Sequence, residues 1–154
     1  MISFFLAQAD QDYEAAKLLF EEYADSIGIN LDFQHFKEEL ADLREMYAPP
    51  YGGIILAKES GKIIGCVGVR KIIGNAGELK RMYIQPAYQG RGAGKCLLEH
   101  ALQLAKQSNY SIIKLDTLSS MPAAMRLYKQ AGFYEIPPYY QNPVGTAVYF
   151  EKIL

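Results

Sequence analysis

The chain has 154 residues, with 16 Lys and Arg against 17 Asp and Glu, so its formal net charge is −1. That length allows one ordinary domain with a full hydrophobic core. Half of the residues are hydrophobic and 21% are charged, which indicates a folded protein and argues against intrinsic disorder. Because the net charge is near zero and no basic stripe stands out, the composition gives no basis for nucleic-acid binding.

The sequence predicts neither a membrane segment nor a secretory leader. The longest apolar runs, such as Gly53–Ala57, are far too short to span a bilayer. The first residues, Met1–Phe5, lack the basic stretch that precedes the apolar part of a signal peptide. The 2 cysteines cannot build a disulfide framework. We therefore expect a cytoplasmic protein with no membrane partner.

The first half of the chain predicts a short strand, two helices and a group of strands. Ile2–Leu6 forms the opening strand. Asp10 is expected to cap a first helix and Asp32 a second, which ends at Pro49-Pro50. Apolar residues at helical spacing define one face of each helix: Tyr13, Ala16, Phe20 and Tyr23, then Phe33, Phe36, Leu40, Leu43 and Tyr47. Runs rich in Ile and Val then predict strands over Gly53–Lys58, Lys62–Ile73 and Glu78–Ile84.

Helices and strands alternate in the second half. The expected elements are a helix over Gly92–Ser108, a strand over Ser111–Thr117, a helix over Pro122–Ala131, and strands over Phe133–Ile136 and Thr146–Lys152. No repeat, low-complexity run or long linker interrupts them, so we expect residues 1–154 to form one domain. The order βααβββαβαββ is typical of an α/β layered domain with a mixed sheet.

The glycine-rich segment Gln89–Lys95 carries the clearest chemical signal. It lies between a predicted strand and a predicted amphipathic helix. Glycines leave backbone N–H groups uncovered, and such groups at a helix N-terminus favour an anion. Arg91 and Lys95 add positive charge suited to phosphate. The segment is therefore predicted to cradle a phosphate or pyrophosphate.

Two familiar phosphate loops do not match this segment. A Walker A loop needs Ser or Thr after Gly-Lys, and here Cys96 follows Gly94-Lys95. The dinucleotide fingerprint Gly-x-Gly-x-x-Gly fails because the sixth position counted from Gly90 is Lys95. On its glycines alone, the segment is also compatible with a strand-to-helix turn that binds nothing.

The segment does resemble the acetyl-CoA signature of the GNAT family of N-acetyltransferases. Gln89-x-x-Gly92-x-Gly94 matches the pattern Gln/Arg-x-x-Gly-x-Gly/Ala of that family. Upstream, Glu78–Pro86 resembles the central strand of the family, and downstream Leu127–Phe133 resembles its C-terminal motif. The order of elements agrees over nearly the whole chain, so the resemblance implies the mixed α/β fold of the acyl-CoA N-acyltransferases.

The resemblance implies acetyl-CoA as co-substrate and requires no metal. The pantetheine arm would pair with main-chain groups of Met82, Tyr83 and Ile84 as an added strand. The pyrophosphate would be held by backbone amides of the glycine loop, with these residues in contact: Gln89, Gly90, Arg91, Gly92, Ala93, Gly94 and Lys95. A Cβ at Gly92 or Gly94 would then crowd the phosphate or force the loop open.

Acetyl transfer to an amine needs a base for the amine and a proton donor for the departing thiolate. Tyr128 matches the family tyrosine near the CoA sulfur and is the candidate acid; its alternative role is a core aromatic. Glu78 stands where the histone-acetylating branch carries its catalytic glutamate and is the candidate base. Partial burial would raise the pKa of Glu78, whereas pairing with Lys80 on the same strand face would lower it.

Other residues give weaker signals. Met121 stands where many family members carry an asparagine that contacts the cofactor, and Ser119 or Ser120 could replace that contact. His35 and His100 lie on separate predicted helices without metal-site spacing, so no metal site is predicted. The acidic pairs Glu21-Glu22 and Glu38-Glu39 are expected to lie on solvated helix faces.

The acceptor site is the least specified part. The family draws its acceptor pocket from the first two helices and the loop before the last strand, so we name four weak candidates: Phe33, Tyr47, Tyr139 and Asn142. These would suit a small amine with an apolar part. The predicted function is direct acetyl transfer from acetyl-CoA to a primary amine in a ternary complex. The alternative is a non-catalytic acyl-CoA sensor or docking module; exposed strand edges near the C-terminus would allow a homodimer.

Overall fold

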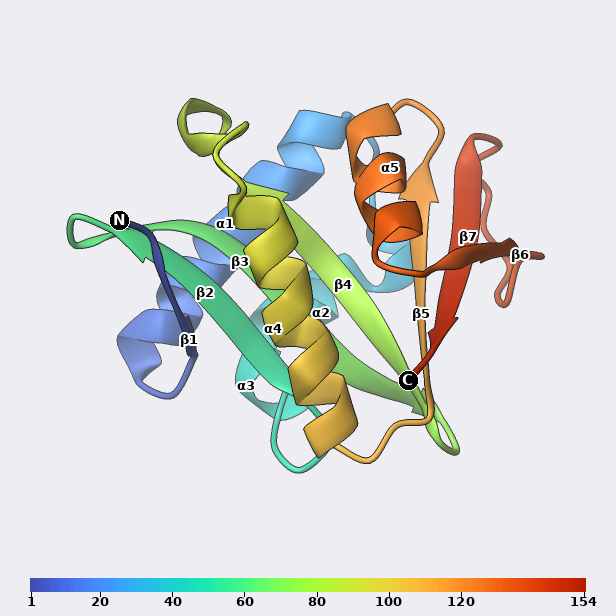
Figure 1. Cartoon of the computed structure of the whole chain (residues 1–154), viewed down its shortest axis with the longest axis horizontal. Coiled ribbons are helices and arrows are strands. Elements are labelled where there is room, and N and C mark those ends of the chain that lie inside the picture. The colour runs from blue at the N-terminus through green and yellow to red at the C-terminus, as the bar shows by residue number, and fades with distance from the viewer.

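One mixed sheet organises the chain in the computed structural model, which describes residues 1–154 (Figure 1). Its seven strands lie in the order β1-β2-β3-β4-β5-β7-β6. They are β1 (Ser3–Leu6), β2 (Gly53–Glu59), β3 (Lys62–Ile73), β4 (Ala76–Ile84), β5 (Ile112–Leu118), β6 (Tyr134–Ile136) and β7 (Ala147–Ile153). β4 and β5 are parallel, and every other neighbouring pair is antiparallel. The predicted mixed α/β sheet is confirmed.

Helices cover both faces of this sheet (Figure 1). They are α1 (Asp10–Ile27), α2 (Phe36–Ala41), α3 (Leu43–Met46), α4 (Ala93–Gln107) and α5 (Pro122–Gln130). α4 crosses one face over β2, β3 and β4, and α1 packs on the opposite face. None of these helices combines the length and the apolar character that a bilayer span requires.

Two predicted helix features are wrong. Asp10 does not cap the first helix: Ala9 is the N-cap, and Asp12 instead accepts the Gln8 and Ala9 N–H groups at 3.0 Å. The predicted second helix is broken into a 3-10 turn over Asp32–Gln34 and the short α2 and α3. One break lies at His35, whose φ of 58° cannot continue a right-handed helix, and the other lies at Asp42, which has a non-helical backbone conformation between α2 and α3. The apolar residues nevertheless keep a helical spacing, because the short helices still turn their apolar sides to the sheet.

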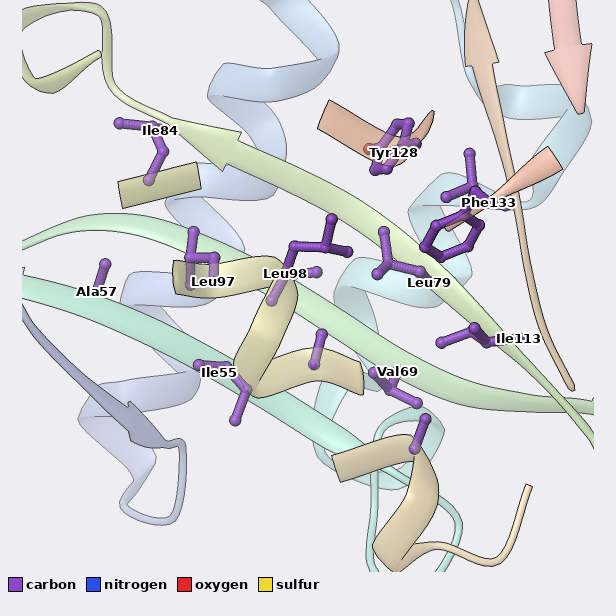
Figure 2. Close-up of a cluster of buried hydrophobic side chains, with 14 of the residues drawn as sticks. Ile55, Ala57, Val69, Leu79, Ile84, Leu97, Leu98, Ile113, Tyr128 and Phe133 are labelled. Atoms are coloured by element: carbon purple, nitrogen blue, oxygen red, sulfur yellow. The ribbon is translucent and has the colours of Figure 1, made fainter. Parts of the chain in front are cut away.

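Separate apolar clusters pack on the two faces. In the cluster under α4 and α5, Leu97 and Leu98 of α4 and Tyr128 of α5 lie over Leu79 and Ile113 of the sheet, as Figure 2 shows. The cluster on the other face joins α1 and α3 to the sheet through residues such as Phe20, Leu43 and Tyr47. Burial of these side chains supplies the main driving force that holds the helices on the sheet.

β4 changes course in its middle. Arg81 has a φ of 58°, and the β3–β4 register passes from Cys66–Tyr83 to Gly68–Lys80, so β4 carries one extra residue and bulges at Arg81. β4 pairs with β5 only over Ala76–Glu78. From Leu79 onward, the edge of β4 that faces β5 has no strand partner, and the two strands diverge toward the end of the sheet where α5 lies (Figure 1).

The bulge also brings a charge into the interior beneath the sheet. Arg81 donates to Glu39 at 2.9 and 3.3 Å, and Tyr47 donates to the same carboxylate at 2.7 Å. Glu39 is fully buried, so the expectation that Glu38-Glu39 is a solvated pair is wrong for Glu39. The short α2 turns this carboxylate inward because Arg81 requires a counter-charge away from water.

We expect Glu39→Ala to lower the free energy of unfolding by about 3–5 kcal/mol, because it leaves Arg81 buried without a partner. Urea unfolding at neutral pH measures the change. Glu38→Ala, which alters the exposed neighbour, is the matched control and should change stability by less than about 0.5 kcal/mol. Equal losses in the two variants would contradict a buried ion pair.

Candidate active site

The glycine loop presents a row of free backbone donors. None of the amide N–H groups of residues 90–95 donates a hydrogen bond within the protein; the first bond into α4 runs from the Cys96 N–H to the Gly92 carbonyl at 3.2 Å. Gly92 is the N-cap of α4 and supplies no side-chain cap. Consecutive free amides at the positive end of a fifteen-residue helix dipole are an arrangement suited to an anion.

Backbone conformation requires glycine at two positions of this loop, Gly90 and Gly92; Gly94 has no positive φ, and a Cβ there would only touch Leu127 at 3.5 Å. Gly90 and Gly92 have φ values of +78° and +82°, which L side chains rarely adopt, and no atom lies within 4 Å of a Cβ built on either. The side-chain amide of Gln89 donates to the Ile84 carbonyl at 2.8 Å and holds the loop against the end of β4. The positive φ values therefore explain why glycine is needed at these two positions. The space over the loop is open.

Arg91 does not contribute a free charge, contrary to expectation. Its guanidinium donates two hydrogen bonds, at 2.7 and 2.8 Å, to Glu59 at the end of β2. This bidentate pair uses the donors that a phosphate would need. Lys95 is exposed on the first turn of α4. The attraction of the loop for an anion therefore rests on its backbone amides more than on its side chains.

A groove continues from the loop toward α5. We call it the α5 groove; its lining consists of Ile84, Gln89, Ser120, Met121, Pro122, Ala123, Ala124 and Leu127. Met121 is the N-cap of α5 without a side-chain hydrogen bond to the helix, and Ser120 lies beside it on the groove wall. The unpaired edge of β4 and the α5 groove together give an extended ligand a path between β4 and β5. Met82, Tyr83 and Ile84 form the end of that edge.

Tyr128 lies on the α5 side of the opening. Its ring is buried against Phe133 and Phe150, with centroids 5.7 and 6.3 Å away, and Figure 2 shows it projecting from α5 over the space between β4 and β5. Its hydroxyl makes no hydrogen bond within the protein, and this oxygen is open to solvent, since every fully enclosed polar side-chain atom of the protein has a partner. Burial raises the pKa of Tyr128 well above its ordinary value, and the nearby Tyr23 and Asp116 raise it further. The phenol therefore keeps its proton at neutral pH and is free to donate it.

Glu78 is buried, and both of its carboxylate oxygens accept hydrogen bonds. Arg70 donates to one carboxylate oxygen at 3.0 Å and the Tyr139 hydroxyl donates to the other at 2.6 Å. Burial would raise the pKa of Glu78, but the charges of Lys80 and Arg70 and the Tyr139 hydrogen bond outweigh it and lower the pKa. Of the two directions that the sequence left open, the lowered pKa is the one found, and Lys80 contributes to it; the ion-pair partner, however, is Arg70, which the sequence did not single out.

A pocket opens beneath the sheet where β4 and β5 diverge. We call it the β4–β5 pocket; it is lined by Tyr23, Ile27, Ile29, Leu31, Phe33, Gln34, Leu79, Lys80, Arg81, Asp116, Thr117, Leu118, Asn142 and Val144. Of the four predicted acceptor residues, Phe33 and Asn142 line it. Tyr139 reaches Glu78 instead. Tyr47 is wrong as an acceptor residue, because its ring is fully buried and its hydroxyl is bound to Glu39.

Apart from Asn142, sequence reasoning did not assign the polar residues around this pocket to the site. The Tyr140 hydroxyl donates to Asp116 at 2.7 Å, and Lys80 donates to Gln34 at 3.1 Å. Strand alternation was the available signal, since Lys114 and Asp116 interrupt the apolar residues of β5 on one face. No local pattern indicated Gln34, which lies 82 residues from Asp116 along the chain.

The lowered pKa of Glu78 predicts how its contribution to stability depends on pH. The ionised carboxylate stabilises the fold above the ordinary pKa of 4.5, and this stabilisation is lost as the pH falls through the lower pKa of the folded state. We expect the free energies of unfolding of wild type and Glu78→Gln to differ by a constant amount above about pH 5 and to converge as the pH falls further. Urea unfolding between pH 3 and pH 7 measures this, with exposed Glu135→Gln as control. A difference independent of pH would contradict the assignment.

Comparison with known proteins agrees with this geometry. The family model "Acetyltransferase (GNAT) family" matches residues 14–133, which include the glycine loop, β4 and Tyr128. An uncharacterised N-acetyltransferase of Schizosaccharomyces pombe is 37% identical over 150 residues, which cover 96% of this chain and 92% of that protein. Human N-acetylaspartate synthetase is 33% identical over 97 residues, which cover 62% of this chain and 32% of that protein.

Solved structures show the same fold. A GNAT-family acetyltransferase of Staphylococcus aureus superposes with a TM-score of 0.82 at 22% identity, covering 99% of both chains. The family model spans most of the chain, and the Schizosaccharomyces pombe relative matches it almost end to end. The chain therefore belongs to the GNAT family of acyl-CoA-dependent N-acetyltransferases.

Proposed function

We propose that this protein transfers the acetyl group of acetyl-CoA directly to a primary amine of a small acceptor, in a complex that holds both substrates at once. The proposal rests above all on the free amides of residues 90–95, which begin α4 beside the end of β4, whose edge facing β5 is unpaired from Leu79 onward. An anion site next to an unpaired strand edge suits a molecule that carries a pyrophosphate on an amide-containing arm. Family membership supports the same donor.

The donor is expected to bind mainly through main-chain groups. The amides of the loop would hold the pyrophosphate, and the open edge of Met82, Tyr83 and Ile84 would pair with the amides of the pantetheine arm. The α5 groove provides the outer wall of this path. Such an arrangement would place the thioester near Tyr128, between the strands, and would leave the β4–β5 pocket for the acceptor.

The reaction then needs two proton movements. The ammonium group of the acceptor first loses a proton, for which we propose Glu78 as the base, directly or through a water; its lowered pKa keeps it ionised at neutral pH. The amine nitrogen attacks the carbonyl carbon, the C–N bond forms and the C–S bond breaks. Tyr128 gives its proton to the leaving thiolate and regains one from the nitrogen. The products are the N-acetylated acceptor, CoA with a free thiol, and one released proton.

The cradle is tested by placing a negative charge at its centre. We expect Gly92→Glu to weaken acetyl-CoA binding at least ~10²-fold, because the new carboxylate faces the pyrophosphate. Isothermal titration calorimetry measures the affinity. Gly74→Glu is the matched control, since Gly74 also has a positive φ of +58° and open space but lies in the β3–β4 turn. Unchanged affinity in Gly92→Glu would rule out the cradle.

The acid is tested by removing one oxygen atom. We expect Tyr128→Phe to lower kcat at least ~10²-fold while leaving acetyl-CoA affinity nearly unchanged, because only the departing thiolate needs the phenol proton. Thiol release and mass spectrometry of the product, over a panel of amines, measure turnover. Tyr134→Phe, which removes an exposed hydroxyl on β6, is the control.

Two results would contradict this assignment. A wild-type rate in Tyr128→Phe would remove the acid role from Tyr128. Tight acetyl-CoA binding by the wild-type protein without turnover of any amine would instead favour the alternative function, a non-catalytic acyl-CoA sensor.

A further inference from the structure

Three ion pairs lie buried or nearly buried beneath the sheet. In two of them, which we call closed, the cation donates a hydrogen bond directly to the carboxylate. Arg70 and Glu78 meet at 3.0 Å, and Arg81 and Glu39 meet at 2.9 Å. In each of these pairs a tyrosine hydroxyl occupies the carboxylate as well, Tyr139 for Glu78 and Tyr47 for Glu39. Such complete pairing is what burial of charge normally demands.

The third pair, Lys80 and Asp116, is open. The Lys80 Nζ lies 3.8 Å from Asp116 Oδ1, which is beyond hydrogen-bond distance. Lys80 makes its one hydrogen bond to Gln34, although an ammonium group has three donors. Asp116 Oδ2 accepts from Tyr140 and Gln34, whereas Oδ1 accepts no hydrogen bond. The Lys80 side chain is only 4% exposed, so its spare donors have little water to satisfy them.

These unused groups face the site of the proposed reaction. Both Lys80 and Asp116 line the β4–β5 pocket. Leu79, which lines this pocket, belongs to the same buried apolar cluster as Tyr128, and the charge of Asp116 raises the pKa of Tyr128, so the pocket lies near the candidate acid. A spare cationic donor and a spare anionic acceptor therefore stand side by side where an acceptor amine would enter.

We propose that the acceptor is an α-amino acid whose carboxylate binds Lys80 and whose amine binds Asp116. This inference rests on the proposed function and names the substrate class of the same site. The two charged groups of an α-amino acid are separated by a single carbon, so they can lie alongside the Lys80–Asp116 pair and satisfy both partners. An amine without a carboxylate would leave Lys80 unpaired, at a cost in binding.

The pairing also suits the chemistry of transfer. Asp116 Oδ1 holds the ammonium form of the amine close to Tyr128, and one proton passes from this nitrogen to Glu78, the proposed base, directly or through a water, before the nitrogen attacks the thioester. The C–N bond forms as the C–S bond breaks, Tyr128 gives its proton to the departing thiolate, and the second proton of the nitrogen replaces it on Tyr128 as the amide forms. An N-acetyl amino acid, free CoA thiol and one proton result. The carboxylate stays on Lys80 throughout and takes no part in bond making.

The rest of the pocket selects the side chain of that amino acid. Its remaining wall is largely apolar and includes Ile27, Ile29, Leu31, Phe33 and Val144. Arg81 is the other cation in the lining, and its charge is already matched by Glu39. A second carboxylate would therefore find no open cationic partner. The pocket favours an apolar side chain over an acidic one.

Steady-state kinetics with matched acceptors test the proposal. The full chain is assayed with acetyl-CoA and leucine, leucinamide, isopentylamine or aspartate, and kcat/KM is compared. We expect leucine to exceed leucinamide at least about 30-fold, because the amide lacks the charge that Lys80 binds. The amine of leucinamide is the less basic of the two and is more often unprotonated at neutral pH, so intrinsic reactivity works against this preference.

Variants assign the preference to one side chain. Lys80→Met should lower kcat/KM for leucine far more than for leucinamide and bring their ratio toward one, whereas Lys80→Arg should restore part of it. Lys114→Met is the control, because Lys114 pairs with Glu151 and does not line the pocket. Thermal unfolding of each variant reports whether it folds, and the wild-type ratio is decisive by itself if Lys80→Met does not.

The outcomes separate the two proposals. If the kcat/KM for leucinamide or isopentylamine equals that for leucine, the inference is overturned and the proposed function stands. A preference for aspartate over leucine would overturn the apolar side-chain assignment. If acetyl-CoA binds but no amine in a broad panel is acetylated, the proposed function fails and the inference fails with it.

Discussion

The divergence of β4 from β5 after Glu78 creates the two spaces on which any chemistry of this fold depends. Parallel strands normally stay paired along their length, and here the bulge at Arg81 turns β4 away after three paired residues. The cost is a non-glycine residue in the left-handed region and a guanidinium beneath the sheet. Glu39 and Tyr47 offset that cost by enclosing the charge. The opening is therefore maintained by a buried ion pair contributed from α2.

Helices on opposite faces of the sheet line different parts of this opening. α4 and α5 provide the glycine loop, the α5 groove and Tyr128 on one face, and the chain from α1 to α2 provides the wall of the β4–β5 pocket on the other. The donor and the acceptor of a transfer reaction would thus approach from different faces and meet between the strands. Direct transfer requires this geometry, because both substrates must be present together.

Charge is arranged so that each buried carboxylate has its own cation. Arg70, Lys80 and Arg81 face Glu78, Asp116 and Glu39 in turn. Desolvation would by itself raise the pKa of Glu78, and the neighbouring cations reverse the direction of the shift. Tyr128 has no such compensation, so its pKa rises and the phenol keeps its proton. One interior thus holds an ionised carboxylate and a protonated phenol within a single site.

The sequence by itself determined most of the elements, the mixed sheet and the glycine loop, because these depend on local periodicity and on residues close together in the chain. Tyr128 and Glu78 were likewise named as candidates from short motifs of residues close together in the chain. Only the tertiary structure decided which charges meet: Glu39 pairs with Arg81 across 42 residues, and Gln34 reaches Asp116 across 82. The breaks in the second helix belong with these contacts, since they turn Glu39 toward its distant partner. Pairing between distant segments leaves no periodic signal, and it is this pairing that brings the Tyr139 hydroxyl to Glu78 and creates the open Lys80–Asp116 pair.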